Sequence, residues 1–306
     1  IRDRSDEPFS IKRVWYPISE NEYQLCTEVI WFPKDRDGWI STLIDESSGN
    51  ILIENSLMND ADNSIDDNCF KMYEFNSRFS ELDTPRIIQS VQYGIYPIPI
   101  ESPGIINSPL IVSPNITENR DWHFDGQMYH DSTRGNNVWV QEDRDRNNNT
   151  YGRAAISTNP SPFLQFLFQP DFSQSPVYLH NQQLGMTQAF FTINRLHDIM
   201  VKYGFDETAG NFQHSNYGLD GIANDYVLAD AQDAGGINNA NFSTPPDGLR
   251  PRMQLYLFNR TNPMRDACLD NTVIIHEYMH VTHCSQVGQE KYLKQIEKYR
   301  DTVLSG

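Results

Sequence analysis

The chain has 306 residues, of which 38% are hydrophobic and 21% are charged, a balance typical of globular proteins and too apolar for a disordered tail. Its formal charge of −17, from 41 acidic and 24 basic residues, repels phosphate backbones and anionic lipid surfaces, so we expect no nucleic-acid partner. No apolar run approaches the roughly 18 residues that a membrane span needs, so we expect no membrane partner either.

Residues 11–56 alternate apolar and polar side chains, as β-strands do. Strand candidates, at residues 13–16, 23–32, 39–44 and 51–53, are separated by polar turns. This pattern predicts an antiparallel β unit. The acidic, polar stretch 58–68 is typical of an exposed linker, and a domain boundary near it divides the chain into residues 1–64 and 65–306.

Residues 70–181 are rich in Pro, Asn, Ser and aromatic side chains, which favours short strands joined by long loops. Apolar residues at helical spacing then predict a helix over residues 187–203, with Gly204 as its stop. A short strand is expected within residues 253–258. The fold class that follows is α+β, with the small antiparallel unit preceding a β-rich subdomain that ends in the helix described next.

Asp270-Asn271-Thr272 can cap a helix that continues into His276-Glu277-Tyr278-Met279-His280. Side chains four residues apart lie about 6 Å apart on one helix face, so His276 and His280 can bind one zinc ion at about 2.0–2.1 Å. Glu277 can take a proton from a water whose pKa the zinc lowers toward about 7. This spacing predicts metal-assisted peptide hydrolysis. The alternative is that all three are ordinary polar residues of a half-buried helix.

A catalytic zinc site needs a third protein ligand. His283 lies about 10.5 Å along the helix from His276, too far to share one ion without breaking the helix, so we interpret it as structural. A second amphipathic helix is expected over residues 289–304. Its carboxylates, Glu290 and Glu297, are interpreted as solvated partners of nearby lysines.

Four cysteines, Cys26, Cys69, Cys268 and Cys284, lie far apart without a metal-binding spacing, and their pattern leaves disulfide pairing open. Glycosylation sequons begin at Asn115, Asn148, Asn241 and Asn259.

Several blocks in order resemble the fungalysin family of secreted zinc endopeptidases, which have a thermolysin-like site. They include Leu196-His197-Asp198, Tyr203-Gly204-Phe205-Asp206-Glu207, Ala229-Asp230-Ala231-Gln232-Asp233, Asn238-Asn239-Ala240-Asn241-Phe242, Thr244-Pro245-Pro246-Asp247-Gly248 and Leu269-Asp270-Asn271. The likeness runs from about residue 70 to His280. It implies a protease that acts on proteins or peptides, Zn²⁺ held by His276 and His280, Glu277 as general base, and an extracellular location.

The resemblance also implies that Asn239, Ala240 and Asn241 lie on an edge strand that pairs with substrate backbone. The alternative for them is a plain Asn-rich loop. The first β unit resembles the end of a family propeptide, which implies that the protease's own prodomain is its inhibitor. After His280 the sequence departs from the family, and the third ligand that the family supplies, a Glu in a Gly-Glu-Gly-Trp-like helix, does not occur among the 306 residues.

The leading hypothesis is therefore a zinc endopeptidase of the fungalysin type, as a proform fragment or a truncated form. A catalytically inactive relative that serves as a structural or binding module is the alternative. A further hypothesis, a lectin-like or adhesive β protein, is supported only by the aromatic, Asn-rich strands and is disfavoured.

Overall fold

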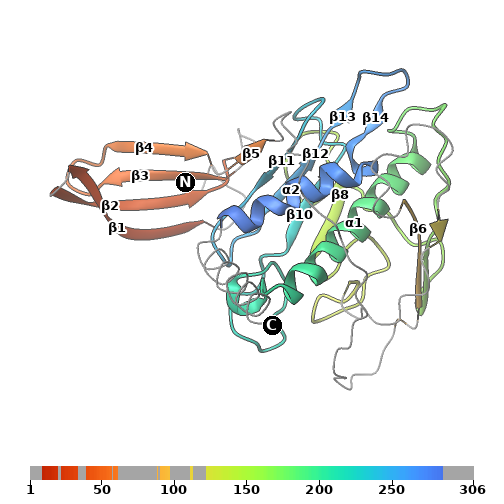
Figure 1. Cartoon of the computed structure of the whole chain (residues 1–306), viewed down its shortest axis with the longest axis horizontal. Coiled ribbons are helices and arrows are strands. Elements are labelled where there is room, and N and C mark those ends of the chain that lie inside the picture. The colour runs from red at the N-terminus through yellow and green to blue at the C-terminus, as the bar shows by residue number, and fades with distance from the viewer. Residues whose placement is uncertain are drawn as a thin grey trace, which may run out of the picture.

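The computed structural model describes residues 9–19, 22–33, 39–56, 58–60, 88, 90–96, 111–112 and 122–284. Near the N-terminus, an antiparallel sheet in the order β1-β2-β3-β4 extends away from the rest of the molecule (Figure 1). Its strands are β1 (Ser10–Ser19), β2 (Glu22–Trp31), β3 (Ile40–Asp45) and β4 (Ile51–Ser56). The alternation of residues 11–56 thus does form an antiparallel unit.

A second sheet has the order β5-β11-β12-β10-β8. Its strands are β5 (Met58–Asp60), β8 (Val138–Glu142), β10 (Val227–Ala231), β11 (Ala240–Ser243) and β12 (Arg252–Leu255). β10 runs parallel to both β8 and β12, whereas β11 is antiparallel to β12 and to β5. Residues 58–60 therefore belong to this sheet, and their interpretation as part of an exposed linker is wrong.

Two small sheets complete the β structure that is described. One, in the order β7-β6-β9, contains β6 (Ser90–Ile95), β7 (Ile111–Val112) and β9 (Phe163–Phe166). The other pairs β13 (Leu257–Phe258) with β14 (Arg265–Asp266). Short 3₁₀ turns occur at Glu207–Ala209 and Ala267–Leu269.

Two long helices, α1 (Leu179–Lys202) and α2 (Asn271–Cys284), pack against each other and against the second sheet (Figure 1). α1 starts at Leu179 and not at residue 187, because polar side chains in its first turns are buried and hydrogen-bonded. Asn181 Oδ1 accepts from the Asp171 backbone N–H at 2.8 Å, and Gln182 Nε2 donates to Gln232 Oε1 at 3.2 Å. The helix ends as expected before Gly204, whose φ of 95° is left-handed.

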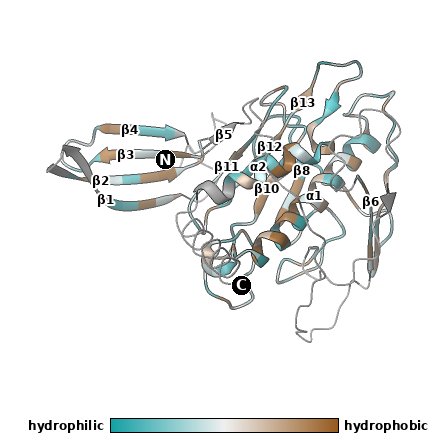
Figure 2. Cartoon of the chain, viewed as in Figure 1, coloured by the Kyte–Doolittle hydropathy of each residue, from teal (hydrophilic) through white to brown (hydrophobic). Residues whose placement is uncertain are grey.

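One apolar core joins these elements. It is formed by the face of α1 with Leu184, Phe190 and Ile193, by β8 and β10 with Val140 and Ala229, and by α2. Figure 2 shows apolar residues along α1 and the central strands of the second sheet. Mixed helices and sheets place the fold in the α+β class. Among the described residues, no helix has the length and apolarity needed to cross a membrane.

The first sheet is attached to this body through Trp39, which is fully buried. The Trp39 backbone N–H donates to Ser243 Oγ at 2.9 Å, and its indole Nε1 donates to the Arg250 carbonyl at 2.8 Å. Phe32 packs edge-on to the Trp39 ring, with centroids 5.8 Å apart, and also lies under the Arg252 guanidinium. These contacts hold the strand ends of the first sheet against β11 and β12.

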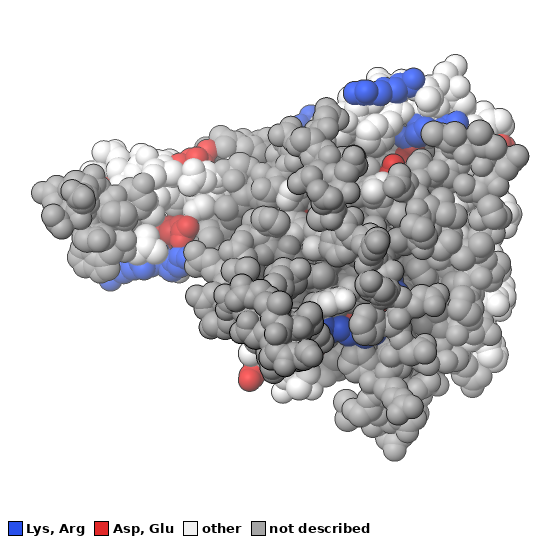
Figure 3. Space-filling model, viewed as in Figure 1, with Lys and Arg blue, Asp and Glu red and all other residues white. Residues whose placement is uncertain are grey.

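Charges drawn in colour in Figure 3 include both signs on the first sheet. There Lys12 pairs with Glu28 at 2.9 Å and Arg13 with Glu46 at 2.8 Å. Such exposed pairs contribute little to stability. Both pairs lie within the first sheet and do not join it to β11 or β12.

Candidate metal centre

The helix that carries the motif begins where the sequence predicts. Asp270 Oδ1 accepts the backbone N–H of Thr272 at 3.0 Å, which is the N-cap interaction expected of this residue. Asn271, the first residue of α2, is buried and donates from Nδ2 to the Tyr96 carbonyl at 2.9 Å. Gln188 and Thr192 of α1 both donate to Asn271 Oδ1, at 2.8 and 3.0 Å. This buried network holds the start of α2 against α1.

The apolar face of α2 holds the helix in the core. Ile274 and Tyr278 are 0% and 1% exposed, and the Tyr278 ring lies against Phe242 of β11, with centroids 6.3 Å apart. Burial, with the Asp198 carboxylate adding to it, raises the pKa of Tyr278 far above its ordinary value. Tyr278 therefore stays neutral and serves to pack the helix.

The structure brings His276, Glu277 and His280 together on α2. The imidazole centroids of His276 and His280 are 4.8 Å apart and their planes lie at 89°. Glu277 is fully buried, and its Oε2 lies 4.0 Å from His280 Nε2. His276 Nε2 is buried and has no hydrogen-bond partner among the residues that the structure describes.

This donor set fits part of a zinc site. An imidazole nitrogen that is buried without a hydrogen bond is costly, and a metal ion would satisfy it. Within the described ranges, no further His, Cys, Asp or Glu side chain joins the two histidines to make a group of three. The side chain of His283, and both Glu290 and Glu297, lie outside the described residues.

The strand expected to bind substrate lies beside the motif helix. β11, with Ala240 and Asn241, contacts α2, and Asn239 directly precedes it. β11 is not at the edge of its sheet, because β5 pairs with it in the register Asn241 to Asp60 and Ser243 to Met58. The expectation of a free edge is therefore wrong for this chain: its own residues 58–60 lie there.

The glycosylation candidates differ in exposure. Asn259 is exposed, Asn148 is half-buried and Asn241 is only 1% exposed. Asn241 also donates from Nδ2 to Tyr256 Oη, so this folded arrangement leaves no space for a glycan on its amide. Asn115 lies outside the described residues. Cys26 and Cys268 are buried free thiols, and the side chains of Cys69 and Cys284 are not among those described.

Two features were missed from the sequence. The pairing of β5 with β11 joins residues far apart in the chain and leaves no local signal. Three buried carboxylates, Asp143, Asp230 and Asp233, also gather at the ends of β8 and β10. Asp143, Asp145 and Asn147 stand at alternate positions, a pattern typical of cation-binding loops that could have identified Asp143 from the sequence.

Comparisons with known proteins agree with this architecture. The chain matches the family Fungalysin metallopeptidase (M36) over residues 92–295. It is 36% identical over 197 residues to the probable extracellular metalloproteinase 4 of Arthroderma benhamiae, a match that covers 63% of this chain and 30% of that protein. Extracellular metalloproteinase 4 of Arthroderma gypseum is 37% identical over the same length, with 30% of it covered.

The corresponding protein of Trichophyton violaceum is 36% identical over 197 residues, and 48% of it is covered. The chain therefore spans about a third to a half of the length of these relatives. The match over residues 92–295 takes in α1, most of the second sheet and the whole motif helix. This chain belongs to the fungalysin metallopeptidase family.

Proposed function

We propose that this chain is part of a zinc-dependent endopeptidase of the fungalysin type that hydrolyses peptide bonds in proteins or peptides. The observation that carries the proposal is the adjacency of His276 and His280, with ring centroids 4.8 Å apart and with the buried His276 Nε2 lacking a hydrogen bond to any described residue. Both imidazoles would hold the metal. The third ligand is proposed to come from sequence beyond residue 306, as the family resemblance implies.

Zinc, when bound, supplies Lewis acidity that polarises a peptide carbonyl and acidifies a water molecule. Glu277 is proposed as the general base that accepts the proton of that water. Its position directly after His276 in α2 and its Oε2 distance of 4.0 Å from His280 Nε2 put its carboxylate beside the metal ligands. Glu277 is part of α2, which fixes its position relative to the two histidines. Because its side chain is fully buried, the carboxylate is shielded from bulk water.

We further propose that residues 1–64 are the tail of a prodomain that inhibits residues 65–306. β5 lies where an extended substrate would pair with Asn239, Ala240 and Asn241, antiparallel to β11. Substrate and β5 would then compete for the same backbone groups. On this proposal the chain is a proform, or zymogen, and a substrate must displace β5 before it can bind.

Location and modification follow from the relatives and remain proposals. The relatives are named extracellular metalloproteinases, which supports secretion of this protein. A secreted protein can be glycosylated at asparagine sequons. Among the described sequon asparagines, Asn259 is exposed and is therefore the proposed acceptor.

Zinc titration of the purified chain tests the two proposed histidine ligands. Because the chain holds two of the three ligands, we expect weak one-to-one zinc binding by isothermal titration calorimetry, at least about 10-fold weaker in His276→Ala and unchanged in Glu277→Gln, because the glutamate is proposed as a base and not as a ligand. His214→Ala, which alters a histidine that bonds the Asp125 carbonyl at 2.7 Å, is the matched control. Equal zinc affinity in the unaltered chain and in His276→Ala contradicts the site.

Hydrogen exchange tests the inhibitory strand. Asn59→Pro removes a backbone donor from β5, so the β11 amides that point toward β5 should exchange at least about 10-fold faster, while those bonded to β12 do not change. Uniform exchange rates across β11 in both proteins would contradict the pairing.

A catalytically inactive relative is the second candidate. The observation that favours it is the pair of histidines without a third ligand in the described residues. Casein hydrolysis separates the two candidates when it is measured on the protein that includes the proposed third ligand and lacks residues 1–64. Zinc binding together with cleavage that is lost in Glu277→Gln supports the protease, whereas zinc binding without any cleavage favours the structural module.

A further inference from the structure

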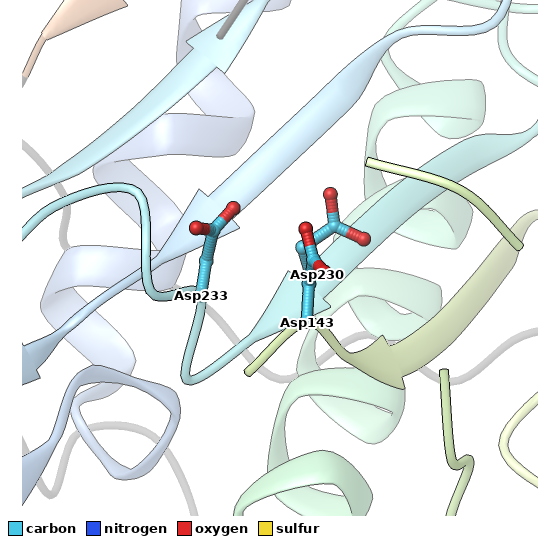
Figure 4. A group of neighbouring side chains, drawn as sticks. All are labelled: Asp143, Asp230 and Asp233. Carbon is cyan, nitrogen blue, oxygen red and sulfur yellow. The ribbon is translucent and has the colours of Figure 1, made fainter. Parts of the chain in front are cut away.

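A second cluster of ionisable groups lies away from the motif helix, at the ends of two neighbouring strands. Asp143 follows β8, Asp230 lies in β10, and Asp233 follows β10 (Figure 4). The three side chains are 2%, 0% and 0% exposed. One carboxylate oxygen from each lies within 4.8 Å of the others.

Three carboxylates lie together in a buried region, where like charges cost free energy unless they are paired or neutralised. Arg252, also buried, pairs with Asp230 Oδ2.

Gln141 supplies a further buried oxygen. It is 1% exposed, its Nε2 lies 3.5 Å from Asp230 Oδ1 and also donates to the Asn149 carbonyl, and its Oε1 has no hydrogen-bond partner among the described residues. The amide group thus lies at the cluster through its Nε2, and its oxygen is an acceptor that no described residue satisfies. Amide oxygens are among the ligands that hard cations use.

The other contacts of the carboxylates leave lone pairs available. Asp143 Oδ1 and Oδ2 accept one backbone N–H each, from Asn147 at 3.1 Å and Asn148 at 3.0 Å, and a side-chain hydrogen bond also joins Asp143 to Asp145. Asp233 accepts from the Gly235 N–H and from Gln254 Nε2, the latter at 2.7 Å. Each oxygen has a second lone pair, so these bonds orient the carboxylates without excluding a metal ion.

We propose that Asp143, Asp230 and Asp233 bind a calcium ion, with the Gln141 amide oxygen as a further ligand. All the donors are oxygens, which favours a hard cation over zinc. Two oxygens at about 2.4 Å from one ion are at most about 4.8 Å apart, which the three carboxylates satisfy. The sequence Asp143-Arg144-Asp145-Arg146-Asn147 has the oxygen residues at alternate positions, as calcium loops do.

This site would join the end of β8 to the end of β10, two parallel strands at the centre of the proposed protease region. It does not depend on the metal centre of α2. Its role is therefore to stabilise the scaffold and not to perform the reaction.

The test uses the full chain, stripped of metal with a chelator and titrated with calcium chloride at about pH 8, well above the ordinary pKa of a carboxyl group. We expect one calcium per chain by equilibrium dialysis. At about 100-fold excess over Kd the Tm should rise by about 5 °C. Asp233→Asn and Asp143→Asn should each weaken calcium binding at least about 10-fold.

Asp225→Asn is the matched control, because Asp225 is also a fully buried carboxyl but lies outside the cluster. It and His276→Ala should bind calcium like the unaltered chain. Circular dichroism checks that each variant is folded. The proposal is overturned by no binding at about 10 mM calcium, by equal binding in both cluster variants, or by a preference for zinc that the same variants remove.

Discussion

At the scale of single residues, the motif helix carries two kinds of buried polar group. His276 Nε2 lacks a hydrogen bond on the face where a metal is proposed, whereas Tyr278 Oη lacks one within the core. The imidazole nitrogen is proposed to bind zinc, whereas the Tyr278 hydroxyl has no proposed ligand. Removing the imidazole should therefore weaken zinc binding, whereas removing the hydroxyl should raise the free energy of unfolding.

Tyr278→Phe removes the buried hydroxyl and keeps the ring against Phe242. Because a buried polar group without a partner costs about 1–3 kcal/mol, we expect the variant to be more stable by about 1 kcal/mol, measured by urea unfolding. Tyr278→Ala, which leaves a cavity, should lose about 3–5 kcal/mol. A loss of stability in Tyr278→Phe would reveal a partner for the hydroxyl.

Asp225 should make stability depend on pH. Burial raises its pKa to about 8, with neighbouring Asp247 adding to the shift and N–H bonds from Gln213 and Gly248 opposing it. The unfolded carboxyl releases its proton near pH 4, whereas the folded one holds it until about pH 8. Folding therefore takes up a proton in this window, and stability falls as pH rises through it.

Asp225→Asn cannot titrate, so its unfolding free energy should decline less between about pH 5 and pH 8 than that of the unaltered chain. Urea unfolding at several pH values gives both slopes. Parallel curves for the two proteins would show that Asp225 is ionised throughout this range.

At the scale of elements, the position of α2 depends on the buried amide of Gln188 in α1. Its Oε1 accepts the Tyr96 N–H at 2.7 Å, and its Nε2 donates to the Tyr96 carbonyl at 3.0 Å and to Asn271. Gln188→Leu leaves the Tyr96 N–H buried without its partner and should cost about 2–3 kcal/mol in thermal or urea unfolding.

Gln183→Leu, at a partly exposed position of the same helix, is the control and should change stability by no more than about 0.5 kcal/mol. If the two substitutions cost the same, the network is not what holds the helices together.

The sequence predicted elements whose causes are local. The Asp270 cap, the helical motif and the stop at Gly204 all depend on neighbours within a few residues, and each lies where expected. The start of α1 was predicted too late, because Asn181 and Gln182 are buried through bonds to distant residues and so hide the apolar pattern. The pairing of β5 and the meeting of Asp143 with Asp230 are long-range contacts that no local pattern encodes.

At the scale of the whole molecule, one aromatic side chain links the first sheet to the body. Trp39→Ala removes a fully buried ring together with its contact to the Phe32 ring and its hydrogen bond to the Arg250 carbonyl. We expect the attachment of the first sheet to be weaker by about 3–5 kcal/mol. Small-angle scattering should show a larger radius of gyration as the sheet moves away from β11 and β12.

Trp39→Phe keeps a ring but loses the bond from the indole to the Arg250 carbonyl, so we expect a smaller loss of about 1 kcal/mol and an unchanged radius. An unchanged radius in Trp39→Ala would mean that other contacts suffice to hold the sheet.

The same attachment sets an order of events during synthesis. Trp39 bonds to Ser243 and Arg250, which follow it by 204 and 211 residues. At about 5–20 residues per second, these partners leave the ribosome about 10–40 s after Trp39 does. The four strands of the first sheet pair only with strands near them in the sequence, so this sheet can form in that interval. Until β11 and β12 have been synthesised, Trp39 and Phe32 have no surface to pack against. During synthesis, docking must therefore follow the emergence of Arg250, and the burial of Trp39 should lag behind the formation of the first sheet in stalled nascent chains.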